Sequence, residues 1–181
     1  MREEVAMPET VQQYAARIRS YMGDQDALTV LAETSQRLRD LTQGLSDAQL
    51  RSRPEPKRWS LMEQIAHLSD VEIVIGFRTR AILGAPDGVA IAAFDQDNWQ
   101  QALRYNEREL DPTLDAFTAA RENNLRLYRS LNEAAWNKFG VHSERGRESV
   151  RDVVFMNAGH DLNHLRQIEA VLSKAAASRQ V

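Results

Sequence analysis

Residues 149–173 read SVRDVVFMNAGHDLNHLRQIEAVLS, and this stretch predicts one long helix with a buried face. Its apolar side chains recur every three or four residues, as on a helix face that packs against a core. Two of the chain's four histidines, His160 and His164, lie on the same face of this helix as Val153 and Ile168. Residues four apart are neighbours on a helix surface, so two imidazoles at this spacing can bind one metal ion.

The same pair also has a simpler interpretation. A buried histidine is commonly a hydrogen-bonded core residue, and two histidines four apart can arise by chance. However, neutral imidazoles in an apolar core carry donors and acceptors that need partners. A metal ion would use the acceptor lone pairs and leave the ring N–H groups for other hydrogen-bond partners. A third ligand elsewhere in the chain would support this hypothesis.

Length and composition restrict the class of protein. With 181 residues, 43% of them hydrophobic, the chain is expected to form a single domain over residues 1–181. It has no cysteine, which excludes disulfides, catalysis by a protein thiolate and cysteine zinc sites. The net charge is −3 with no basic cluster, so no nucleic-acid partner is expected. No run is long enough to cross a membrane, and the first ten residues lack a signal-peptide core, so we expect a cytoplasmic protein.

The hydrophobic pattern predicts an all-α fold. Four long amphipathic helices are expected, which suit a four-helix bundle with short extra helices. Loops are expected at Arg51–Ser60 and Gly84–Asp97, and Lys138–Glu148 reads as a turn-rich loop or short hairpin. The four long helices are expected at Asp24–Thr42, Ser60–Leu83, Asp111–Trp136 and Ser149–Ser173, with shorter ones at Pro8–Met22 and Asn98–Glu109.

The helix beginning at Ser60 supplies the third candidate ligand, His67. Ser60 and Glu63 fit a capping box, in which each side chain accepts a hydrogen bond from the other's backbone N–H. His67 borders the apolar stripe of this helix. It could be a half-buried histidine that binds a carbonyl, or it could join His160 and His164, since bundle sites are built from inward side chains on facing helices.

Three neutral nitrogen ligands suit Zn²⁺, Ni²⁺, Cu²⁺ or Fe²⁺, and they leave a coordination position open for chemistry. That position can hold a water molecule, whose pKa the ion lowers, or a substrate thiol. Either reaction needs a nearby base or a carboxylate that supports the ligands. Glu63 and Asp70 are the candidate catalytic groups, although the cap alone would explain Glu63; Asp161 ranks last because it points about 100° away from His160.

Four further residues are assigned less specific roles. Arg121 and Asn124 could line a pocket with Tyr128, but side chains of this kind are more often helix-edge residues with solvated tips. His142 lies in a loop and is expected to be exposed.

Several motifs resemble the DinB-like (YfiT-like) superfamily. Trp59-Ser60 with Glu63, His67, Asp70 and Glu72 is similar to its WSxxExxxHxxDxE stretch, and His160-Asp161-x-x-His164 to its second metal motif. Asp95-x-x-x-Trp99 and the loop from Gly140 through His142 to Gly146 are similar to the YfiT-like branch. The similarity extends over most of the chain. Gly159, next to His160, weakens the helix by up to about 1 kcal/mol, and its small size would make room beside a metal.

The resemblance implies an up-down-down-up four-helix bundle with a divalent metal, zinc or nickel first, on His67, His160 and His164. It also implies a homodimer. Related proteins transfer low-molecular-weight thiols or carry out thiol-dependent isomerisation, and many are described as metal-dependent hydrolases. We therefore expect an enzyme acting on a small molecule, either a thiol S-transferase or a hydrolase.

Two alternatives to an enzyme stay open. One is a binding or stress-response module whose metal is structural or absent. The other is a helical interaction protein with histidines only in its core, for which the charged loop Arg51–Arg58 would be the contact surface.

Overall fold

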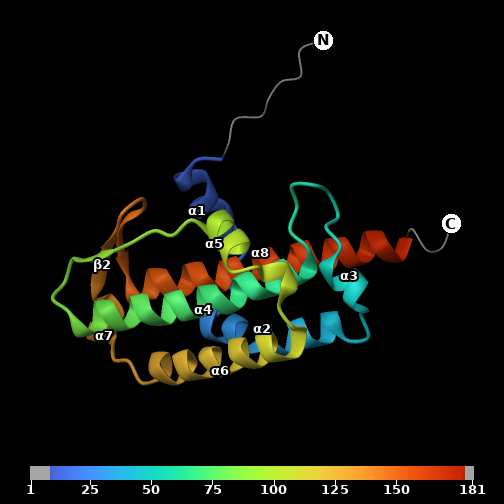
Figure 1. Cartoon of the computed structure of the whole chain (residues 1–181). Helices are drawn as coiled ribbons and strands as arrows, with labels where there is room; N and C mark the ends of the chain where they lie inside the picture. The colour runs from blue at the N-terminus through green and yellow to red at the C-terminus, as the bar shows by residue number, and fades with distance from the viewer. Residues whose placement is uncertain (1–8, 178–181) are drawn as a thin grey trace, which may run out of the picture.

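The computed structural model describes residues 9–177, so Pro8, the first residue of the predicted N-terminal helix, lies outside the described part. Four long helices form the bundle, with α4 against α6 and α8, and α2 against the same two. Figure 1 shows that α2 and α8 run in one direction and α4 and α6 in the other, which is the predicted up-down-down-up arrangement. The four helices are α2 (Ala27–Thr42), α4 (Leu61–Gly84), α6 (Leu110–Arg129) and α8 (Val150–Ala177).

The start of α4 confirms the predicted capping box. The Ser60 side chain accepts a hydrogen bond from the backbone N–H of Glu63, and the Glu63 carboxylate accepts one from the N–H of Ser60 at 2.7 Å. Both residues are buried. These bonds satisfy backbone donors that have no partner within the helix, so they fix where α4 begins relative to the core.

The helix predicted from Asp111 to Trp136 is wrong at its C-terminal end. α6 ends at Arg129, and a separate helix, α7 (Glu133–Asn137), follows. The Asn132 side chain accepts a hydrogen bond from the N–H of Ala135 and begins α7. An asparagine favours such a cap over a helix interior, and this local competition outweighed the apolar spacing.

A small sheet covers one end of the bundle. The predicted hairpin is confirmed by β2 (Phe139–His142) and β3 (Gly146–Ser149), which pair antiparallel. A third strand, β1 (Val89–Ile91), pairs parallel to β2, where the sequence predicted only loop. β1 owes its conformation to hydrogen bonds with a strand far along the chain, so its own three residues gave no signal.

The shorter helices complete the chain, and α1 (Val11–Ser20) packs on α8. A Cβ built on Gly159 would lie 2.5 Å from the carbonyl oxygen of Ile18 in α1, so this glycine makes room for the α1 backbone and not for a metal, which corrects the expectation. The single helix predicted over Asn98–Glu109 is wrong, because the structure has a short α-helix and a separate 3-10 helix there. These elements are α1 (Val11–Ser20), α3 (Asp47–Arg51), α5 (Gln96–Ala102) and the 3-10 helix η1 (Tyr105–Glu107). Within residues 9–177, no helix is both long and apolar enough to span a membrane.

Candidate metal centre

The three predicted histidines meet inside the bundle, His67 from α4 and His160 and His164 from α8. The Nε2 atoms of His67 and His160 are 3.2 Å apart. One ring nitrogen from each of the three histidines lies within 4.8 Å of the others. Nitrogen ligands of a tetrahedral zinc ion, each about 2.0–2.1 Å from it, would be about 3.3 Å apart. The spacing of the rings therefore fits a single ion.

Burial keeps the three imidazoles neutral. His67 and His164 are almost fully buried, and His160 keeps part of its surface open to a cavity. Loss of hydration lowers the pKa of all three rings, and the neighbouring His160 lowers those of His67 and His164 further. Burial, with a smaller effect of Arg121, lowers the pKa of His160 to about 4. At neutral pH the lone pairs are thus free to bind a cation.

Two neighbours hold the rings in place. Trp59 packs edge-to-face on His67, with ring centroids 4.9 Å apart. The Nδ1 atom of His164 lies 3.4 Å from the Oε1 atom of Gln64, which favours a proton on Nδ1 and leaves Nε2 as the ligand atom. Three neutral, convergent nitrogen donors form a set that suits zinc or nickel.

The two predicted catalytic carboxylates are bonded elsewhere. Glu63 accepts hydrogen bonds from the backbone of Ser60, from Arg53 and from Gln100. Asp70 forms a two-bond ion pair with Arg108, each bond 2.9 Å long. Neither residue belongs to the cluster of potential ligands among the described residues. The structure thus brings the three histidines together without these carboxylates, whose catalytic role stays a prediction.

Asp161, the lowest-ranked carboxylate, lies in a buried ionic network. Arg121 donates to Asp161 at 2.7 Å and pairs with Glu72 at 2.8 Å. Arg121, Asn124 and Tyr128 are all buried, so the expectation of solvated tips was wrong. Burial alone would lower the pKa of Arg121, but the two carboxylates raise it overall. Residues local to Arg121 in the sequence do not reveal these partners, which come from other helices.

The family model of the DinB superfamily matches residues 31–168. The chain belongs to the DinB superfamily. YfiT from Bacillus subtilis has a similar structure, with a TM-score of 0.78 and 15% sequence identity over 97% of this chain and 94% of YfiT. YfiT is described as a probable metal-dependent hydrolase with an unusual four-helix bundle topology. A search of curated proteins gave no match.

In this DinB-superfamily chain, a cavity of about 400 Å³ opens beside the histidines. His67 and His160 line one part of it. The wall carries apolar side chains that include Val71, Ile75 and Phe94. Three protein ligands are typical of metal sites that keep one coordination position open, and this cavity borders two of the three rings.

The same cavity contains two residues that sequence reasoning missed. Arg78, on α4, lines the cavity, although no sequence pattern indicated a functional role for it. His142 was expected to be exposed, but it is 2% exposed, because strand pairing places it between β1 and β3. The glycine-flanked histidine motif around residue 142 was the available signal, although nothing local to it indicated a buried ring.

Proposed function

We propose that this DinB-superfamily protein is a divalent-metal-dependent enzyme that acts on a small molecule, with zinc or nickel on His67, His160 and His164. The convergence of three neutral imidazoles beside a cavity of about 400 Å³ is the observation that carries the proposal. A bound ion would act as a Lewis acid and lower the pKa of a water or thiol in its open position.

The residues of the chain would hold the ion in a fixed geometry. At neutral pH the three rings can bind a metal ion without first losing a proton, because burial lowers their pKa values. Gln64 orients His164, and Trp59 packs edge-to-face on the ring of His67. Such fixed geometry lets an ion keep one position open for substrate.

Two reaction classes are supported by different observations. Hydrolysis is supported by the description of YfiT, which shares the fold. Transfer of a low-molecular-weight thiol is supported by the carboxylates near the cluster, because Glu63, Asp70 and Asp161 are all held by arginines. A metal-bound thiol is deprotonated by the ion itself and has less need of a carboxylate base than water does. We favour thiol transfer on this ground.

Metal content provides the first test. Wild-type protein purified without chelators is expected to hold about one ion per chain, and His160→Ala is expected to lose it, since a three-ligand site tolerates no missing ligand. His142→Ala removes the one histidine outside the cluster and should keep its metal. Equal, near-zero metal in wild type and His160→Ala would contradict the proposal.

A reaction screen separates the two classes. The metal-loaded protein is incubated with small thiols and a chromogenic electrophile, and separately with chromogenic esters and amides. Thiol consumption that requires His160 supports transfer, whereas ester or amide cleavage with the same requirement supports hydrolysis. Metal removal that unfolds the bundle, with no reaction in either screen, would favour a binding module. The homodimer stays a prediction, which light scattering would test.

A further inference from the structure

The cavity extends along α4, away from the histidines. His67, Val71, Ile75 and Arg78 all line it, and they lie on one side of the helix. Arg78 lies eleven positions after His67, which corresponds to about 16 Å along a helix axis. The cavity therefore has a metal-binding end and a second end built around Arg78.

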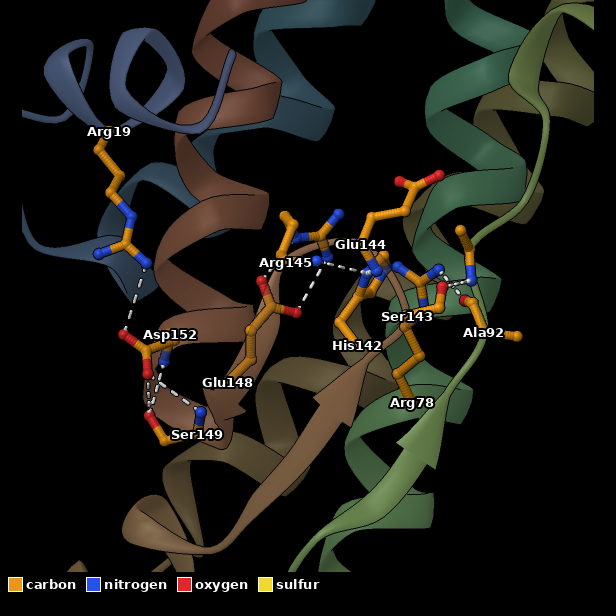
Figure 2. Close-up of polar contacts among 11 residues, drawn as sticks. Arg19, Arg78, Ala92, His142, Ser143, Glu144, Arg145, Glu148, Ser149 and Asp152 are labelled. Atoms are coloured by element: carbon orange, nitrogen blue, oxygen red, sulfur yellow. Dashed lines mark hydrogen bonds and ion pairs between the residues drawn. The ribbon is translucent and has the colours of Figure 1, made fainter. Parts of the chain in front are cut away.

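Arg78 is a buried cation without a carboxylate partner. Its side chain is 8% exposed, and its Nη2 atom donates to the carbonyl oxygen of Ala92 at 2.6 Å (Figure 2). Its guanidinium lies over the ring of Phe94, 5.6 Å from the centroid. Within the described residues, Arg78 forms no ion pair, and its Nε and Nη1 atoms have no hydrogen-bond partner. A buried charge is costly unless an opposite charge compensates it.

The other charged groups at this end already have partners or face water. Arg145 pairs with Glu148 through two hydrogen bonds, which Figure 2 shows beside Arg78. Asp95 caps α5, and Glu144 is exposed. The remaining acid that lines the cavity, Glu9, forms a salt bridge with Arg17. Arg78 thus contributes one uncompensated positive charge to this end.

His142 contributes a neutral donor at the same end. Its Nδ1 atom accepts hydrogen bonds from the backbone N–H groups of Glu144 at 3.2 Å and Arg145 at 3.4 Å. The proton of the neutral ring is therefore on Nε2. That atom is buried and has no partner among the described residues. A buried donor without an acceptor in the protein is unusual and calls for an external one.

We propose that Arg78 and His142 bind the carboxylate of a small-molecule substrate whose apolar body lies against Val71, Ile75 and Phe94 and whose reacting group lies at the histidines. A planar guanidinium matches a carboxylate in shape. One uncompensated positive charge, with Glu144 nearby, suits a monoanion better than a phosphate dianion. The role in catalysis rests on the proposed metal-dependent function, although carboxylate binding does not.

A binding comparison tests the carboxylate site. Zinc-loaded full-length protein is titrated by calorimetry with 3-phenylpropanoate and with its neutral amide. Wild type is expected to bind the acid about ten- to hundredfold more tightly, as charge-assisted hydrogen bonds contribute. Arg78→Gln is expected to lose this preference. Arg147→Gln, which removes an exposed charge from the same sheet without lining the cavity, is expected to keep it.

Several results would overturn the assignment. These are equal binding of acid and amide by wild type, a preference that persists in Arg78→Gln because the acid binds the ion, or tighter binding of phenyl phosphate than of the acid. Arg78→Met replaces the cation with an apolar chain of similar length and gives the same readout if Arg78→Gln does not fold. An Arg78-dependent preference in protein that holds no metal would leave this site standing while the metal-dependent function fails.

Discussion

Gly159 marks a close approach of α1 to α8, the helix that carries His160 and His164. A Cβ there would also lie 2.9 Å from the Cγ2 atom of Ile18. We predict that Gly159→Ala lowers the free energy of unfolding by about 1–3 kcal/mol, because the backbone of α1 must move. The usual gain from replacing a helical glycine, up to about 1 kcal/mol, is too small to compensate. Urea denaturation measures the change.

Gly84→Ala is the matched control, since a Cβ at the end of α4 would meet no atom within 4 Å. It should be neutral or slightly stabilising. If both variants were equally stable, close packing of α1 on α8 in solution would be refuted.

At the scale of single residues, local spacing predicted positions well and long-range partners poorly. The inward seam indicated that His160 and His164 face one point, and the capping box identified the role of Glu63 at the start of α4. Burial of Arg121 could not be predicted, because its carboxylates, Glu72 and Asp161, belong to other helices. A buried charge looks like a surface charge until its partners are known.

Arg121 acts at the scale of elements, because it joins all four long helices. From α6 it donates to the carbonyl oxygen of Leu31 in α2 at 2.8 Å, and it pairs with Glu72 in α4 and Asp161 in α8. We predict that Arg121→Met destabilises the protein by about 3–5 kcal/mol, since it leaves the buried carboxylates of Glu72 and Asp161 without a counter-charge, although Glu72 keeps its hydrogen bonds from Asn124 and Asn157. Thermal or chemical unfolding provides the measurement.

Arg126→Met removes a charge from the same helix, where the side chain is 73% exposed, and should change stability by less than about 0.5 kcal/mol. A similarly small effect in Arg121→Met would show that Glu72 and Asp161 are satisfied without it.

Elements themselves were predicted best where amphipathic spacing persists for several turns, as in α4 and α8. The strand β1 was missed because its conformation depends on pairing with β2.

At the scale of the whole molecule, the buried histidines couple stability to pH. Their pKa values are lowered in the folded protein, so the unfolded chain binds more protons as the pH falls below about 6.5. The stability of the metal-free protein is therefore full above about pH 6.5 and decreases as the pH falls toward the folded pKa values. For His160, with a pKa of about 4, the loss by about pH 5 is about 2 kcal/mol.

Comparison with His160→Ala isolates this effect from the carboxylates, which titrate in both proteins. The unfolding free energies of the two metal-free proteins are measured in urea at about pH 7.5 and about pH 5. Wild type should lose about 2 kcal/mol more than the variant between these values. A stability difference that does not change with pH would mean that His160 is hydrated in the folded protein, and the interior site would then not hold neutral ligands ready for an ion. A pH-dependent difference would show that burial of the neutral imidazoles lowers the stability of the metal-free protein as the pH falls. A bound cation would then stabilise the folded protein by binding these neutral rings.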